Sequence, residues 1–363
     1  MPDNLPTIWS ADPHTLAKHK ILSRYLDAWI PILSRTNPGG HALFVDAFAG
    51  PGEYSGGQPG SPLIALRTTR AAVEKLNTTF HFRFAEADIE RCEALGSVLE
   101  REKESLSHPR IKFSPPVCQD AATMISEFLD GVRGPKLPSI FFLDQFGYKD
   151  VPMSLLARLL SFQQCEVLTY LEVRKLSNFF TDKTKWKTFD AAFGDDSWRA
   201  ALTLEDGRKR EVKIAAIYAD ALSRNAGAKF TWRFAMKGAN NQIIYWLFFC
   251  TGNIRGLEEM KKAMLKVDDS GQFMFSDFQG GDQLSMASHF NGAWLSQDLI
   301  LRFAGSDVTV QEVKEYVLTG TPCVLFKKSL GMLEREGRVQ RLSGIPARRK
   351  GDFPDAQERL RFK

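Results

Sequence analysis

Four acidic side chains in the first half of the chain each stand directly after a short run of mostly apolar residues. They are Asp46 after Leu43-Phe44-Val45, Glu86 after residues 80–85, Asp120 after Val117-Cys118-Gln119, and Asp144 after residues 139–143. Carboxylates accept hydrogen bonds from hydroxyl and amino groups. If the runs are parallel strands of one sheet, their carboxyl ends meet at one edge. We therefore predict a single ligand site there.

A glycine-rich turn, AFAGPGEYSGGQPG, follows Asp46. Gly50 and Gly52 allow a sharp turn whose backbone N–H groups can meet the polar end of a ligand. Ser61 and Pro62 are typical of a helix start. Strand, acid, glycine turn and helix together predict the opening of a nucleotide-binding α/β unit. An ordinary strand-to-helix loop is the alternative.

The other acids have two readings each. Glu86 can accept hydrogen bonds from both ribose hydroxyls of a nucleotide, or it can cap a helix. Asp120 can accept from an adenine amino group, or it can be the N-cap of a helix over 121–132. Within the long loop, Glu53, Tyr54 and Ser55 either close over the ligand or form a flexible surface loop.

Apolar periodicity predicts the elements that hold these residues. A helix over 14–34 comes first; for its Lys18, His19 and Lys20 we favour a solvated face over contact with a phosphate or substrate. The four strands that end at the acidic residues then alternate with helices over 62–76, 89–103, 121–132 and 152–162. A fifth strand follows over 166–171. This alternation predicts an α/β fold with a Rossmann-like doubly wound sheet.

The remaining chain predicts two further parts. Residues 172–230 read as a helical insertion, followed by strands over 230–236 and 242–251 and a helix over 252–267. Helices over 288–303, 309–318 and 322–336 precede a segment, 338–342, that can pair with residues after Gly344. Three helices and a hairpin are the winged-helix layout. The predicted divisions are a helical segment 1–40, a Rossmann domain 41–286, a winged-helix-like domain 287–350 and a basic tail 351–363.

The positive charge of the chain is concentrated near its end. The formal net charge is +5, and residues 325–363 hold 11 Lys and Arg against 5 Asp and Glu. This excess predicts a polyanion partner such as nucleic acid, or else a solvated tail that aids solubility. The predicted phosphate contacts are Lys327, Lys328, Arg348, Arg349 and Lys350.

Several classes of protein are disfavoured. Five widely spaced cysteines contain no C-x-x-C pair and the histidines no metal spacing, so we expect no metal site and a reducing compartment such as the cytoplasm. The first residues lack a basic segment followed by an apolar one, so we expect no signal peptide. The longest apolar run, residues 243–250, is too short to span a membrane.

The motifs resemble those of class I S-adenosylmethionine-dependent methyltransferases. The resembling residues are Asp46-Ala-Phe-Ala-Gly50-Pro-Gly52, Glu86, Asp120 and Asp144-Gln-Phe-Gly147. The long Gly-Pro-Gly-Glu-Tyr loop, the Asp-x-Phe-Gly segment and Leu247-Phe-Phe-Cys-Thr251-Gly-Asn resemble more closely the three-Cys-motif partner protein family. That family is associated with a three-cysteine protein similar to radical-S-adenosylmethionine enzymes, so the resemblance implies such a partner.

The resemblance also implies site residues. S-adenosylmethionine would contact Asp46, Phe48, Ala49, Gly50, Gly52, Tyr54, Glu86, Ala87, Asp120, Ala121 and Asp144. The catalytic segment would be Asp144, Gln145, Phe146 and Tyr148, where Gln145 departs from the Asp-Pro-Pro-aromatic pattern of enzymes that methylate base amino groups. Gln145 could still bond a substrate, and Phe146 or Tyr148 could stack on it.

Two functions follow. The first is a methyltransferase acting on or with nucleic acid. The second is a non-catalytic protein that keeps the α/β scaffold and binds DNA or a protein through its C-terminal domain. A dehydrogenase is a weaker third, because the turn lacks the last glycine of G-x-G-x-x-G.

Overall fold

The computed structural model describes residues 6–131, 137–145, 147–238, 240, 242–268, 273–276, 292–342, 352–353 and 356–363. The chain forms two compact units. Unit 1 comprises Met1–Val267 and Phe275–Gln279, and unit 2 comprises Asp268–Met274 and Gly280–Lys363.

A mixed sheet is the centre of unit 1. Its strands are β1 (His41–Asp46), β2 (Thr79–Glu86), β3 (Ile111–Phe113), β4 (Val117–Cys118), β5 (Ser139–Leu143), β6 (Cys165–Leu171), β7 (Phe230–Lys237), β8 (Ile243–Thr251) and β9 (Met274–Ser276). Their order is β3-β2-β1-β5-β6-β8-β7-β9, with β4 paired to the end of β2. Strands β1, β2, β3, β5 and β6 are parallel, whereas β8 runs antiparallel to β6 and β7.

The central strands are apolar because helices cover both faces of the sheet. Every residue of β5 and β6 is buried. Strand β1 lies between β2 and β5, and Asp46 pairs in register with Phe84 and Phe142. The chain winds outward in both directions from β1, so the carboxyl ends of β1, β2 and β5 flank the switch point where such sheets bind ligands.

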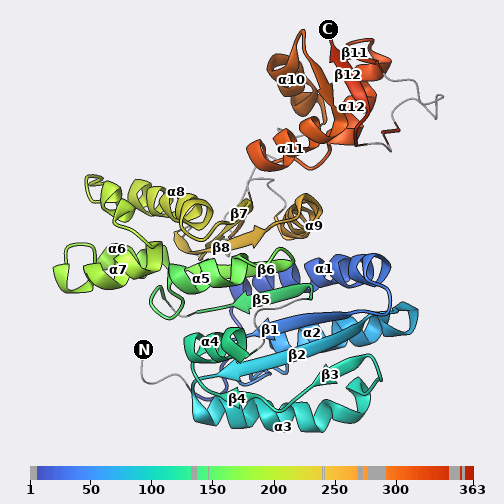
Figure 1. Ribbon diagram of the computed structural model, residues 1–363. Helices are drawn as coiled ribbons and strands as arrows, with labels where there is room; N and C mark the ends of the chain where they lie inside the picture. Colours follow the sequence, from blue (N-terminus) through green and yellow to red (C-terminus); the bar gives the residue numbers. More distant parts are fainter. Residues whose placement is uncertain are drawn as a thin grey trace. The chain divides into compact units, whose positions relative to one another are not determined.

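Helices pack in rows on the sheet (Figure 1). The first row contains α1 (Pro13–Thr36), α2 (Ser61–Ala72), α3 (Ile89–Leu106) and α9 (Ile254–Leu265). The second contains α4 (Ala121–Gly131), α5 (Met153–Leu160) and α8 (Gly207–Arg224). A short 3-10 helix, Val73–Lys75, extends α2.

The predicted insertion is helical. It contains α6 (Val173–Asn178), α7 (Trp186–Phe193), α8 and two 3-10 helices, Lys183–Lys185 and Ser197–Ala201. Its aromatics form a core in which the Trp198 ring centroid lies 5.4 Å from that of Phe180 and 5.0 Å from that of Phe189. Phe180, Phe189 and Trp198 are thus packing residues of this segment.

Unit 2 alternates helices and strands. Its elements are α10 (Gly292–Phe303), β10 (Asp307–Thr309), α11 (Val310–Gly320), α12 (Phe326–Arg335), β11 (Val339–Arg341) and β12 (Arg359–Phe362). The strands form an antiparallel sheet in the order β10-β12-β11. Leu299, Val313, Leu330 and Leu360 are fully buried in the core between helices and sheet.

The end of the chain corrects a prediction. Strand β11 pairs with β12, which lies after Gly344 as predicted, but residues 359–362 are the central strand of the sheet rather than part of a basic tail. Leu360 and Phe362 point into the core while Arg359 and Arg361 are exposed. This alternation is a strand pattern of only four residues, which the surrounding basic charge concealed.

Two cysteines are paired despite their wide separation in sequence. A disulfide joins Cys92 of α3 to Cys118 of β4, and Cys165, Cys250 and Cys323 are buried free thiols. The spacing of the cysteines did not predict this bond. Within the described residues, every helix is too short or too polar to cross a bilayer.

Candidate ligand site at the carboxyl ends of the strands

Asp46 is a buried carboxylate that lacks a complete set of partners. It ends β1 and has no exposed surface. The Phe48 N–H donates to its Oδ1 at 3.1 Å, and Ser61 provides a further side-chain hydrogen bond. Its Oδ2 is buried and has no hydrogen-bond partner among the described residues. Burial raises the pKa of Asp46 to about 7, although the bonds from Ser61 and Phe48 oppose the rise. Among the described residues, no group therefore satisfies this buried oxygen.

The two glycines of the turn have different roles. Gly50 has a φ of 61°, and a Cβ added there would meet nothing within 4 Å. Gly52 has a φ of 86°, and a Cβ there would lie 2.8 Å from the Leu95 side chain on α3. Gly52 thus allows the turn to pack against α3, whereas Gly50 faces open space.

Glu86 holds the turn from the neighbouring strand. Its Oε2 accepts from the Gly50 N–H at 2.9 Å, and its Oε1 accepts from the Asp88 N–H at 3.0 Å. Each carboxylate oxygen can accept a second hydrogen bond, so ligand hydroxyls can still be bound. Helix capping, the alternative for Glu86, is performed by Asp88, which accepts from the Arg91 N–H at 3.0 Å. Ala87 between them is exposed.

Asp120 acts as a helix cap. It is exposed and accepts from the Thr123 N–H at 3.0 Å and from the Thr123 hydroxyl at 2.7 Å, at the start of α4. These hydrogen bonds lower the pKa of Asp120. The structure thus shows the capping role, and contact with an adenine ring stays a prediction. Ala121 is buried as the first residue of α4.

The long loop after the turn is a hairpin. Glu53 and Pro59 form a β-bridge, the Tyr54 N–H donates to the Gln58 carbonyl at 3.0 Å, and the Gly60 N–H donates to the Gly52 carbonyl at 2.7 Å. The hairpin places Tyr54 beside Asp46 and Asp144. Burial of Tyr54 raises its pKa, and the negative charges of Asp144 and Asp46 raise it further.

The N-terminal segment covers this hairpin. The Ser55 N–H donates to the Trp9 carbonyl at 2.9 Å, and the Trp9 ring lies 5.8 Å from that of Tyr54. On its other side, the Arg91 guanidinium lies 4.9 Å from the Trp9 ring. The turn and the start of α3 are therefore joined by the segment before α1.

Helix α1 supplies a cation that the sequence analysis placed in solvent. The Lys18 ammonium forms an ion pair with Asp144 at the end of β5, and the two side chains are 7% and 19% exposed. Lys18 Nζ also lies 6.0 Å from the Tyr170 ring and 5.8 Å from the Tyr245 ring. The expectation of a solvated face is wrong for Lys18 and His19, which are both buried, and holds for Lys20.

A signal for the buried lysine was present. Lys18 stands four and seven residues before Leu22 and Tyr25, both buried, so it lies in the apolar stripe of α1. A lysine in such a stripe needs a partner, which Asp144 provides.

The segment after β5 turns away from the site after Asp144. Gln145 is 1% exposed; its Nε2 donates to the Tyr170 carbonyl at 3.0 Å and its Oε1 accepts from the Val151 N–H at 3.2 Å. Both ends of this amide are used within the protein, so Gln145 orders the loop. Contact of Gln145 with a substrate stays a prediction. Tyr148 packs against Phe189 of the insertion, with ring centroids 5.0 Å apart. Phe146 lies outside the described residues.

The predicted nucleic-acid contacts can be placed in part. Lys327 and Lys328 are exposed on the first turn of α12. Arg348, Arg349 and Lys350 lie outside the described residues. Of the described side chains, no three His, Cys, Asp or Glu are grouped so as to hold a metal ion.

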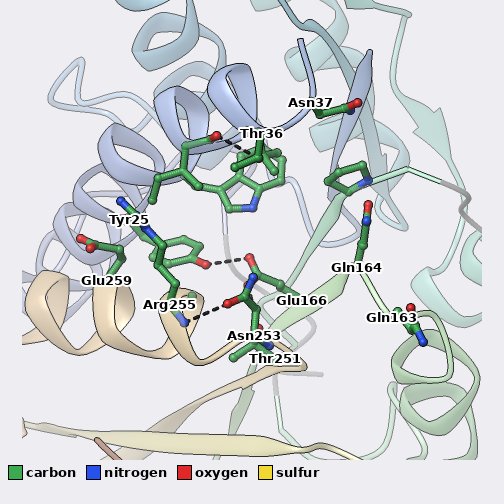
Figure 2. Close-up of a pocket in the computed structure, with 15 residues that line it drawn as sticks. Tyr25, Thr36, Asn37, Gln163, Gln164, Glu166, Thr251, Asn253, Arg255 and Glu259 are labelled. Carbon is green, nitrogen blue, oxygen red and sulfur yellow. Dashed lines mark hydrogen bonds between the residues drawn. The ribbon is translucent and has the colours of Figure 1, made fainter. Parts of the chain in front are cut away.

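A separate cavity of about 380 Å³ lies at the amino ends of the strands (Figure 2). Glu166, near the start of β6, accepts from the Tyr25 hydroxyl of α1 at 2.6 Å and from the Thr251 hydroxyl of β8 at 2.7 Å. Burial raises the pKa of Glu166. This network attaches the middle of α1 to the sheet. It therefore helps to fix Lys18, on the same helix, at the carboxyl ends of the strands.

Comparison with known proteins identifies no family. No family model and no curated protein matches the chain. Among solved structures, a Legionella pneumophila protein assigned to the family DUF519 aligns with a TM-score of 0.37 and 11% identity, over 66% of this chain and 85% of that one. A methyltransferase from Geobacter sulfurreducens aligns with a TM-score of 0.30 and 12% identity, over 69% of this chain and 91% of that one.

Proposed function

We propose that unit 1 binds S-adenosylmethionine and transfers its methyl group. The observations that carry this proposal are the unpartnered Oδ2 of Asp46 and the open space at Gly50 in the turn that follows it. S-adenosylmethionine has an α-ammonium group and a sulfonium centre, so its methionine end would supply the cation that this buried carboxylate lacks. The Gly50 turn leaves room for that end to approach the backbone.

The neighbouring elements fit the same cofactor. Glu86 retains acceptor capacity for ribose hydroxyls, as the corresponding acid does in nucleotide-binding sheets. Strand β8, antiparallel and placed between β6 and β7, is also typical of class I methyltransferase sheets. Doubly wound dinucleotide-binding sheets are mostly parallel, so this strand disfavours the dehydrogenase reading.

The methyl acceptor would lie beside Asp144. Asp144 and Lys18 together offer an acceptor and a donor that can orient a nucleophile in line with the methyl group. Methyl transfer to a good nucleophile depends mainly on such positioning. Lys18 is therefore added to the site that the sequence predicted.

Nucleic acid is the acceptor or partner that we favour. The element order of unit 2 and its antiparallel sheet fit a winged helix with α12 as recognition helix, and Lys327 and Lys328 are exposed on that helix. A three-cysteine partner similar to radical-S-adenosylmethionine enzymes is a proposal that rests on the sequence resemblance alone.

A non-catalytic scaffold is the second candidate. It is favoured by the inward orientation of Gln145 and by the neutralisation of Asp144 by Lys18, which both reduce the polar groups free to act on a substrate. In that case unit 1 would bind no sulfonium cofactor, and unit 2 would carry the binding function.

Calorimetric titration with S-adenosylhomocysteine, the product of methyl transfer, tests the proposal. We expect micromolar affinity, at least tenfold weaker binding by Asp46→Asn and Glu86→Gln, and no effect of Glu104→Gln, which removes a carboxylate exposed on α3. NAD should not bind. If S-adenosylhomocysteine does not bind the wild type, or binds all three variants equally, the site assignment is wrong.

A further inference from the structure

A groove of about 440 Å³ runs between α1 and the hairpin that follows the glycine turn. Its lining residues are Leu16, His19, Lys20, Ser23, Arg24, Gln58, Pro59 and Ile64. The described residues that line it include two cationic side chains and none that is acidic. The groove thus has the charge of an anion site.

His19 gives the groove an unsatisfied polar group. Its side chain is buried, at 5% exposed, and Nδ1 has no hydrogen-bond partner among the described residues. Burial, and then the nearby charge of Lys18, lower the pKa of His19 to about 3, so the imidazole is neutral. Buried polar atoms are nearly always paired in folded proteins, so this nitrogen is available to an ordered water or a ligand.

The hairpin contributes a second group of this kind. The Gln58 Oε1 is buried without a partner among the described residues. Rotation of its amide by 180° would turn the NH₂ group to the same position. Gln58 can therefore donate to a ligand oxygen as well as accept from a ligand hydroxyl.

The cations of the groove are available. Lys20 is exposed and makes no ion pair with the described residues. Arg24 Nη1 lies 3.6 Å from Asp27 Oδ2. Both side chains are more than half exposed, so this ion pair is weak. Lys20, Ser23 and Arg24 are spaced three and four residues apart and thus share one face of α1.

We propose that this groove binds a phosphate group of a nucleic-acid acceptor. The proposal rests on the proposed methyl transfer and adds the means by which the acceptor is held. Lys20 and Arg24 supply charge, Ser23 and Gln58 supply donors, and His19 supplies a ring N–H. Lys18, which pairs with Asp144 at the proposed acceptor edge, belongs to the same turn of α1 as Lys20.

Direct binding of the anion can be observed at His19. In full-length protein with ¹⁵N-labelled histidine, inorganic phosphate should shift the His19 ring resonances saturably and raise the pKa of His19, because a nearby anion favours the imidazolium form. Lys20→Gln/Arg24→Gln should abolish the shift. Arg35→Gln/Lys75→Gln, which removes the same charge from exposed positions outside the groove, should preserve it. A shift that is absent, or that persists in Lys20→Gln/Arg24→Gln, overturns the proposal.

The source of the phosphate is tested with single-stranded oligonucleotides, a mononucleotide and inorganic phosphate, titrated at several salt concentrations. Lys20→Gln/Arg24→Gln should weaken oligonucleotide binding about tenfold and reduce the salt slope by about 1.4, that is, about 0.7 for each lost contact with a single strand. Arg35→Gln/Lys75→Gln should change neither. Equal affinity of the oligonucleotide for wild type and Lys20→Gln/Arg24→Gln overturns the proposal, as does a mononucleotide that binds more tightly than the oligonucleotide.

Affinity for S-adenosylhomocysteine separates the two proposals. Affinity for S-adenosylhomocysteine should be the same in Lys20→Gln/Arg24→Gln and in the wild type, because neither side chain belongs to the cofactor site that we propose. If the wild type binds oligonucleotide through the groove but binds no S-adenosylhomocysteine, the phosphate site stands without the methyl transfer. The reverse result removes the phosphate site alone.

Discussion

At the scale of single residues, Asp46 makes the cofactor assignment sensitive to pH. Its pKa is raised to about 7 in the free protein. An ammonium group binds the ionised form, so below pH 7 a proton must leave before the cofactor is held. We expect the affinity for S-adenosylhomocysteine to fall by up to about tenfold per pH unit below pH 7. Calorimetry between pH 5.5 and 8 measures this, and Asp46→Asn should remove the dependence. A flat profile in the wild type would show that Asp46 does not meet the cofactor.

The same shift predicts a cost in stability. A carboxyl whose folded pKa is raised stabilises the fold below its unfolded pKa of 3.8, and that contribution is lost as the pH rises toward about 7. At pH 8 the ionised Asp46 therefore destabilises unit 1 by up to about 4 kcal/mol. We expect Asp46→Asn to raise the free energy of unfolding at pH 8 and to change it little at pH 4. Urea denaturation at the two pH values measures this; lower stability of Asp46→Asn at pH 8 contradicts it.

Some residue roles could be predicted from sequence and others could not. Asp46 and Glu86 follow apolar runs directly, so local sequence predicts their positions at strand ends. The partners of Lys18 and Gln145 lie 126 and 25 residues away in sequence, respectively. Such pairings depend on which helix face meets which strand end, and local periodicity does not specify that contact.

At the scale of elements, the two glycines of the turn should affect different properties, Gly50 mainly ligand affinity and Gly52 mainly stability. Alanine at either Gly50 or Gly52 would adopt a positive φ, which costs about 1 kcal/mol or more. Gly52→Ala also meets Leu95 at 2.8 Å, so we expect it to lose more stability than Gly50→Ala. Gly50→Ala places a methyl group in the space assigned to the cofactor and should weaken S-adenosylhomocysteine binding about tenfold or more. Thermal denaturation and calorimetry of both variants measure the difference. Equal affinities for the two variants would place the ligand elsewhere.

Strands and helices of the sheet are largely those that local sequence indicates. The predicted strand 139–143 coincides with β5, and the predicted helix 121–132 nearly coincides with α4. Long apolar runs and clear caps explain this agreement, because burial on both faces leaves little choice of structure. The hairpin at 53–59 was not predicted, since its geometry depends on contact with Trp9, which is distant from it in sequence.

At the scale of the whole molecule, the fold of unit 2 depends on the last residues of the chain. Strand β12 pairs with both other strands of its sheet, and Leu360 and Phe362 are buried in the core. From sequence, residues 351–363 were predicted to be a basic tail. Its high content of basic residues suggested a solvated tail. The alternation of basic and apolar residues over 359–362 instead indicates a strand with one buried face.

Truncation after Lys350 should therefore unfold unit 2. It removes the central strand of the sheet and two large apolar side chains, a loss that exceeds the few kcal/mol by which a small domain is stable. We expect the calorimetric transition of unit 2 to disappear while that of unit 1 remains. Arg359→Gln/Arg361→Gln is the matched control: it removes two of the same charges, including the bonds of Arg361 to Asp307 at 2.7 and 2.8 Å, and should cost only about 1 kcal/mol because these side chains are exposed.

The two outcomes decide how nucleic-acid binding must be measured. If truncation unfolds unit 2, loss of binding in the truncated protein would report the loss of α12 as well as of basic charge, so Lys327→Gln/Lys328→Gln in the intact chain is the informative variant. It should weaken binding and reduce the salt slope by about two. If the truncated protein instead keeps both transitions, β12 is dispensable, and the basic end can be tested directly by its removal.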